Sequence, residues 1–144
     1  MRALAQFERY DAAFAVTRDT VLRHGYSTRP PDFEGFVAEH DVHGVKGMLI
    51  YYEIPFTLRA APTLYIKELI VDAEWRGFGI GEQLVRAAAA EALARGCALT
   101  KWQVARWNVS AARFYRRLGA HVDDEWVDYQ LDTAAMQRLA EIDV

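Results

Sequence analysis

Cysteine is almost absent from this chain of 144 residues, and Cys97 is its only one. A single cysteine excludes a disulfide within the chain and fits a reducing compartment, so we expect a cytoplasmic protein in which Cys97 is a structural thiol. No apolar run approaches the length that spans a bilayer, and residues 1–11 lack the pattern of a signal peptide. We therefore expect no membrane partner.

Net charge is low as well. The 17 basic and 20 acidic side chains leave a formal charge of −3. This balance argues against nucleic acid as the main partner and is compatible with a cationic substrate. His40 and His43 are the only close pair among the four histidines, and no cysteine or acid cluster completes a metal site, so we expect no metal. The length and ordinary composition predict a single domain over residues 1–144.

The pattern of apolar residues predicts an α/β chain. The expected helices cover 2–10, 18–24, 79–95, 110–118 and a short stretch that begins after Asp132 or Thr133. The expected strands cover 33–40, 45–56, 64–71, 97–105, 120–122 and 126–131, with a hairpin turn at 41–44. Thr17 and Ser110 are the expected caps of the second and fourth helices, and Gly25, Gly96 and Gly119 are the expected helix ends.

The predicted strand 64–71 is apolar except for Lys67 and Glu68. Such a run favours a central strand that is buried on both faces. Because an unpaired buried charge is costly, these two side chains need a structural or functional reason.

A glycine-rich loop, WRGFGIG at residues 75–81, joins this strand to an alanine-rich helix. The first N–H groups of a helix have no partner within it, and the helix dipole places partial positive charge there. Gly77, Gly79 and Gly81 leave no side chain to block a phosphate and can adopt positive φ, while Arg76 adds a cation. The loop therefore favours an anion-binding site. A helix start without a ligand is the alternative.

Two well-known glycine patterns do not fit this loop. A Walker loop requires Lys and Ser/Thr where this chain has Glu82 and Gln83, and the dinucleotide fingerprint requires a G-x-x-G spacing that is absent here. The pattern (Q/R)-x-x-G-x-(G/A) does fit, starting at Arg76. It resembles the pyrophosphate loop of the GNAT superfamily of acetyl-coenzyme A-dependent N-acetyltransferases.

A second motif, residues 108–120, resembles the GNAT signature N-x-x-A-x-x-F-Y-x-x-x-G-(F/A) and follows the loop after one helix and one strand. The segments WRGFGIG, ARWN, FYRRLGA and EWVDYQLD resemble the diamine (spermidine/spermine) and thialysine N-acetyltransferase branch. The resemblance implies the GNAT fold: a mixed, mostly antiparallel twisted sheet with a central splayed strand pair and flanking helices. That branch usually begins with one further strand and the first half of a helix, so the resemblance implies that the first strand is missing here. A homodimer is expected by analogy.

The resemblance also implies how acetyl-CoA is held. The end of the third strand bonds the pantetheine arm through backbone groups, Asn108 bonds it from the other side, and the glycine loop holds the pyrophosphate. Arginines of the fourth helix can meet the nucleotide phosphate, or form a solvated face. The expected cofactor contacts are Leu69, Ile70, Val71, Arg76, Gly77, Phe78, Gly79, Ile80, Gly81, Glu82, Asn108 and Arg116.

Two residues are the implied proton carriers. A lysine-like amine has a pKa of about 10.4, so its neutral form costs about 4–5 kcal/mol at pH 7 and requires a base. Glu68 matches that base; a paired carboxylate that fixes the strand is the alternative. Tyr115 matches the acid that protonates the leaving thiolate; a core aromatic beside Phe114 is the alternative.

Two further residues bear on the substrate. Glu8 matches a substrate-contacting acid of the polyamine enzymes, or is an exposed helix glutamate. Lys67 stands where those enzymes carry an acid, and a cation there would repel a polyamine, although it could help an amine lose its proton. The expected function is direct acetyl transfer from acetyl-CoA to a primary amine of a small molecule such as a polyamine, diamine or lysine analogue. An acyl-CoA-binding module without chemistry, or a protein N-acetyltransferase, are the alternatives.

Overall fold

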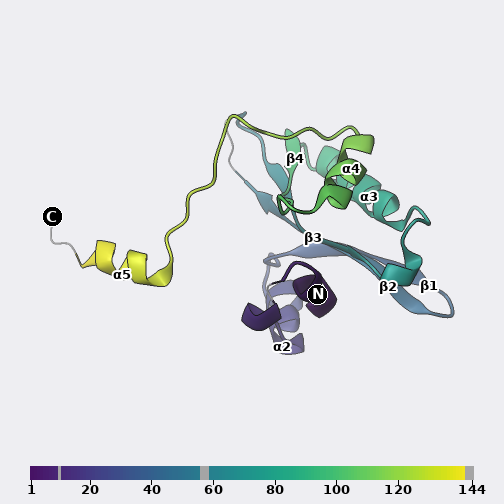
Figure 1. Cartoon of the computed structure of the whole chain (residues 1–144), viewed down its shortest axis with the longest axis horizontal. Helices are drawn as coiled ribbons and strands as arrows, with labels where there is room; N and C mark the ends of the chain where they lie inside the picture. The colour runs from purple at the N-terminus through teal and green to yellow at the C-terminus, as the bar shows by residue number, and fades with distance from the viewer. Residues whose placement is uncertain (10, 56–58, 142–144) are drawn as a thin grey trace. The chain divides into compact units, whose positions relative to one another are not determined.

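A computed structural model describes residues 1–9, 11–55 and 59–141. The chain divides into two compact units, Met1–Val109 and Ser110–Val144, which are treated separately below. The first unit holds a sheet with helices on both of its faces (Figure 1). That all 144 residues form a single domain stays a prediction.

Four strands form the sheet in the order β1-β2-β3-β4. The strands are β1 (Glu34–His40), β2 (Gly44–Ile54), β3 (Thr63–Val71) and β4 (Leu99–Lys101). The first three pair antiparallel, and the predicted hairpin turn joins β1 to β2. β4 pairs parallel with β3, but only from Thr63 to Tyr65. Because β3 continues to Val71 without β4 beside it, the two strands splay, and the expected mixed α/β sheet is confirmed.

The core lies between the sheet and α3 (Ile80–Ala94). Leu84, Ala88 and Ala92 of the helix pack on Leu49 and Leu64, both of which are fully buried. Small alanine side chains let the helix approach the sheet closely. A closer contact still occurs at Gly47 of β2, where a methyl group would lie 3.0 Å from Ile80 and 3.1 Å from Leu84. Leu84, Ala88 and Ala92 therefore form the buried face of this helix.

Two N-terminal helices, α1 (Arg2–Phe7) and α2 (Arg18–Leu22), lie on the opposite side of the sheet from α3 (Figure 1). Thr17 caps α2 as predicted, in a reciprocal capping box with Thr20. The prediction that Gly25 ends this helix is wrong, because a π-helical turn continues from Arg23 to Ser27. The Ser27 and Thr28 hydroxyls donate to the carbonyls of Leu22 and His24, so the side chains satisfy this wider turn.

The second unit holds α4 (Val109–Arg117) and α5 (Thr133–Ala140). Because α4 begins at Val109, Ser110 lies in its first turn, and the predicted Ser110 cap is wrong. Gly119 ends α4 as predicted: its φ is +93°, and the N–H groups of Gly119 and Ala120 bond back to Arg116 and Tyr115. The Asp132 carboxylate caps α5 by accepting the N–H of Ala135 at 2.7 Å.

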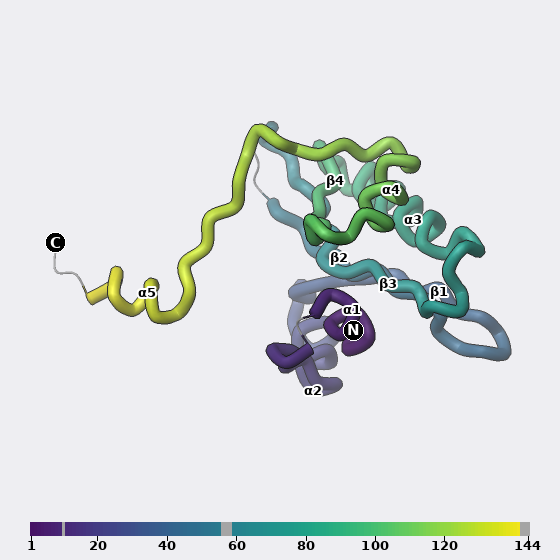
Figure 2. Tube along the Cα trace, viewed as in Figure 1, coloured from purple at the N-terminus to yellow at the C-terminus, as the bar shows by residue number. Residues whose placement is uncertain are grey.

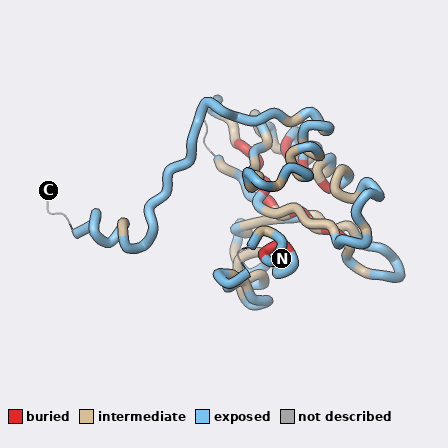
Figure 3. Tube along the Cα trace, in the orientation of Figure 1, coloured by how far each residue is buried: buried red, intermediate tan, exposed pale blue. Residues whose placement is uncertain are grey.

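Both closing strands were predicted wrongly. Residues 120–122 and 126–131 form no strand in the described part of the chain, and residues 121–134 are exposed (Figure 3). Alternating apolar residues favour a strand only where another strand supplies hydrogen bonds, and none pairs with this segment. The strand predicted at 97–105 shortens to Leu99–Lys101.

Candidate functional site

The glycine loop has the geometry of an anion site. Gly77 and Gly79 have φ values of +82° and +81°, and a methyl group on either would meet no atom within 4 Å. Gly79 is the N-cap of the 15-residue helix α3, and no side chain of this cap accepts from the first N–H groups of the helix. Figure 2 follows the chain from β3 through this loop into α3. An anion with several oxygens fits here.

Charged side chains flank this loop. The Arg76 Nε donates to the carbonyl of Val71 at 3.1 Å, which ties the loop to the end of β3. Glu82, in the first turn of α3, accepts from Arg86 at 2.7 and 3.1 Å, so its negative charge is partly compensated. Phe78 is 73% exposed at the loop surface. The loop therefore offers an anion backbone donors and a nearby guanidinium.

Trp75 packs the start of the loop against the β1–β2 hairpin, a role that the sequence did not predict. Its ring lies 4.9 Å from the ring centre of His40 and 5.5 Å from that of His43. Lys46 places its ammonium over the same ring and pairs with Asp72 at 3.3 Å. The β1–β2 hairpin therefore holds residues 72–75, which lead into the glycine loop, in place.

The end of β3 borders the opening between the splayed strands. Leu69, Ile70 and Val71 pair on one side with β2, whereas their other edge faces no strand of the described chain. Asn108 lies half-buried beyond β4, and its backbone N–H donates to Ala105 at 2.8 Å. The hydrogen bond from Arg76 to Val71 connects the glycine loop to this open end of β3.

A β-bulge in β3 sets the direction of two charged side chains. Ile50 pairs with Glu68 and the next residue, Tyr51, pairs with Ile66, so Lys67 is an extra residue with no partner on β2. Ile66 and Leu69 both belong to the core beneath α3. Lys67 and Glu68 consequently both point away from this core, although neighbours in a regular strand face opposite sides. The bulge explains how two charges fit into an otherwise apolar strand.

Glu68 lies in an environment that favours its protonated form. Burial raises the pKa of this carboxyl group above its usual range, and the Glu8 carboxylate raises the pKa further. The Lys67 ammonium and the terminal amine act in the opposite direction. Glu8, at the end of α1, is half-buried. The predicted base and both predicted substrate residues are thus close enough to interact electrostatically.

Two aromatic residues that the sequence reasoning did not assign to the site connect its parts. Phe7 of α1 lies 5.7 Å from Trp107, ring centre to ring centre, and the Arg76 guanidinium stands 5.5 Å over Phe7. Arg9 stands 5.0 Å over Trp107. Phe7 therefore bridges the glycine loop and the segment before Asn108. In the sequence, Trp107 was noted only as part of the ARWN segment that resembles the N-acetyltransferase branch.

Tyr115 and Arg116 belong to the second unit and are described within it. Tyr115 is half-buried, with its ring edge-on to Phe114 at 5.0 Å, and Arg116 is exposed. Arg117 places its guanidinium 5.7 Å from the Phe114 ring centre. Phe114 is half-buried as well and α4 has no buried residue, so the role of Tyr115 as an acid stays a prediction.

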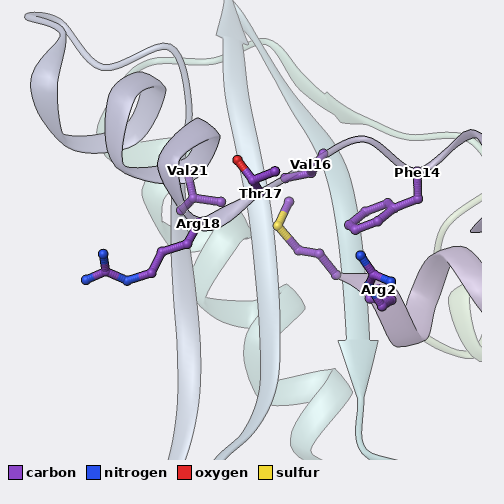
Figure 4. A pocket seen from close by; sticks show the side chains of 7 residues that line it. Arg2, Phe14, Val16, Thr17, Arg18 and Val21 are labelled. Atoms are coloured by element: carbon purple, nitrogen blue, oxygen red, sulfur yellow. The ribbon is translucent and has the colours of Figure 1, made fainter.

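A shallow cavity of about 230 Å³ lies elsewhere, between α1 and α2 (Figure 4). It is lined by Met1, Arg2, Phe14, Val16, Thr17, Arg18 and Val21. None of the predicted site residues lines it.

Among the described residues, no helix is long and apolar enough to cross a bilayer, and no group of three His, Cys, Asp or Glu side chains is arranged to hold a metal.

Comparison with known proteins decides the family. A profile described as "Acetyltransferase (GNAT) family" matches residues 3–120. The chain belongs to the GNAT acetyltransferase family. It is therefore an acyltransferase, and the predicted resemblance to the superfamily and to its thialysine branch is confirmed.

Individual relatives agree with this assignment. The thialysine N-epsilon-acetyltransferase of Mus musculus is 28% identical over 97% of this chain and 87% of its own length. The L-ornithine N5-acetyltransferase of Arabidopsis thaliana is 30% identical over 79% of this chain and 50% of its own. Among solved structures, an integron cassette protein from V. cholerae has a TM-score of 0.78 and 25% identity, covering 97% of this chain and 86% of that one.

Proposed function

We propose that this GNAT acetyltransferase transfers the acetyl group of acetyl-CoA directly to a primary amine of a small molecule. The observation that carries the proposal is the open glycine loop at the start of α3, next to the end of β3 that carries the half-buried Glu68. Relatives named for thialysine and ornithine, which are small amines, support the acceptor class.

Acetyl-CoA supplies the activated acetyl group and an anionic pyrophosphate. The backbone N–H groups at residues 77–82, with Arg76 beside them, would hold the pyrophosphate. Backbone groups of Leu69, Ile70 and Val71, with Asn108, would bond the pantetheine arm along the open edge of β3. Arg116 would meet a nucleotide phosphate. In this arrangement the thioester would reach the splay between β3 and β4, near Glu68.

Three proton transfers complete the reaction. Glu68 would accept a proton from the ammonium of the acceptor, directly or through a water, because its raised pKa brings its basicity closer to that of the amine. The neutral amine then attacks the thioester carbonyl, its C–N bond forms, and the C–S bond breaks. Tyr115 would donate its phenolic proton to the departing thiolate, and the resulting phenolate would accept the second proton of the acylated nitrogen, which leaves a neutral amide. Glu8 and Lys67 would contact the acceptor.

We also propose a homodimer. β1 is an edge strand of the sheet, with Val37 61% exposed, and an open edge of this kind favours pairing with a second chain.

A cytoplasmic location stays a prediction from the sequence, as does the absence of a resident metal, of a nucleic-acid partner and of a membrane partner.

A thiol-release assay with acetyl-CoA tests the function. The acceptors are lysine, thialysine, ornithine, putrescine, spermidine, an amino sugar and a histone-like peptide. Thiol release that depends on one or more of the small amines is the expected result. Release with the peptide alone would favour protein acetylation, and acetyl-CoA binding without release would favour a binding module that has lost the chemistry.

A further inference from the structure

We propose that Lys67 selects the acceptor by binding a carboxylate, so that the enzyme prefers an amine whose molecule also carries a carboxylate over the same amine without one. The inference rests on the proposed function, because it concerns the acceptor side of that site. The reacting amine would meet Glu68 while the carboxylate meets Lys67, its neighbour on the same face of β3.

The bulge makes this arrangement possible. Ile66 packs in the core beneath α3, so in a regular strand Lys67 would point away from that core and Glu68 into it. The extra residue turns Glu68 to the face of Lys67, so one small molecule can contact both side chains. The Lys67 ammonium can bind the carboxylate of an acceptor while the neighbouring Glu68 carboxylate binds its ammonium.

The charge of Lys67 is available to a ligand. Its side chain is exposed, and within residues 1–9, 11–55 and 59–141 it makes no ion pair shorter than 4 Å. By contrast, Lys46 on β2 is already paired with Asp72. An acceptor with cations alone would be repelled by Lys67, whereas a carboxylate would be attracted.

Neighbouring groups on this face suit the rest of such a molecule. Tyr52 and Tyr65 stack with ring centres 5.2 Å apart, two residues along β3 from Lys67, and form a flat apolar surface for a short carbon chain. Glu8 supplies a second carboxylate, which suits a second ammonium. The face therefore complements an amino acid with an amine in its side chain better than a diamine.

Two matched pairs of acceptors test this inference. Lysine and cadaverine differ only by the carboxylate, as do ornithine and putrescine. We expect kcat/KM to favour the carboxylate-bearing member of each pair by about 10- to 100-fold, as for one charge-assisted hydrogen bond. Lys67→Met should remove most of this preference through KM, Lys67→Arg should retain it, and Lys67→Glu should reverse it.

Lys101→Met is the matched control, because Lys101 is another exposed strand lysine, on β4. It should leave the preference unchanged. Equal preference in the wild type and in Lys67→Met, with acetyl transfer intact, would overturn the inference and leave the proposed function standing. Absence of thiol release with every amine would instead overturn the proposed function, and the inference with it.

Discussion

Replacing Gly79 by alanine separates the cofactor role of the glycine loop from its role in folding. Gly79 has a φ of +81°, and Gly96, at the other end of α3, has a φ of +71°. Neither glycine has an atom within 4 Å of an added methyl group. Alanine at either position therefore introduces the same left-handed strain and no clash, but only Gly79 lies in the proposed pyrophosphate loop.

The expected magnitudes follow from this geometry. A non-glycine residue in the left-handed region costs roughly 1–2 kcal/mol, so each variant should lose a few degrees of Tm, at about 2–4 °C per kcal/mol. Gly79→Ala should also weaken acetyl-CoA binding by about tenfold or more, which corresponds to roughly 1.4 kcal/mol, because the loop relaxes away from its donor geometry. Gly96→Ala should bind acetyl-CoA as the wild type does.

Thermal unfolding and isothermal titration with acetyl-CoA, run on both variants, measure the two effects independently. Unchanged affinity in Gly79→Ala would refute the assignment of this loop to the pyrophosphate. Equal weakening in both variants would show that the affinity follows the stability of α3 and not the geometry of its first turn.

Three further changes test other parts of the account. Glu68→Gln should lower kcat by about 10²- to 10⁴-fold and abolish the acidic limb of the pH–rate profile. In the wild type this limb should lie above the usual carboxyl range, because burial raises the pKa of Glu68. An unchanged profile would exclude Glu68 as the base. Tyr115→Phe should lower kcat while acetyl-CoA affinity stays within about twofold, since the acid acts only in the chemical step; unchanged turnover would remove Tyr115 from the mechanism. Arg95→Met should destabilise the fold by about 1–3 kcal/mol at neutral pH, because Arg95 donates to both oxygens of Glu34 at 2.8 Å. Arg95 holds the pKa of Glu34 below its usual value, so the stability from this pair is present above the unfolded pKa and is lost as the pH falls through the folded one. Urea titrations should therefore show a smaller difference between wild type and variant at low pH than at pH 7, and an equal difference at both would contradict this linkage.

Local patterns made the glycine loop and its helix predictable from the sequence. Gly79 and Gly96 bracket an alanine-rich stretch, and the structure places α3 between them. β1, β2 and β3 were predicted within a few residues because each carries a sustained apolar or β-branched run. These elements depend mainly on residues that are close in the sequence.

The parts that the sequence reasoning missed depend on residues that are distant in the chain. The shift in strand register at Lys67 exists only in the pairing of β3 with β2, and no single-strand pattern encodes it. β4 ends at Lys101 because β3 and β4 diverge there, although the predicted strand continues to Ala105. The segment 126–131 has strand composition, but it pairs with none of the strands that the structure describes. The contact between Phe7 and Trp107 likewise joins residues near the first and last positions of the first unit's sequence.

Mass spectrometry of both the acceptor and the intact protein tests direct acetyl transfer most directly. The protein is incubated with acetyl-CoA, first alone and then with lysine, ornithine, putrescine or spermidine. Direct attack predicts that the protein mass is unchanged without an acceptor, and that an acceptor gains one acetyl group on a primary amine as free thiol is released. An acetylated protein that passes its acetyl group to the amine would contradict direct attack, and no acetylated amine despite bound acetyl-CoA would contradict the proposed function.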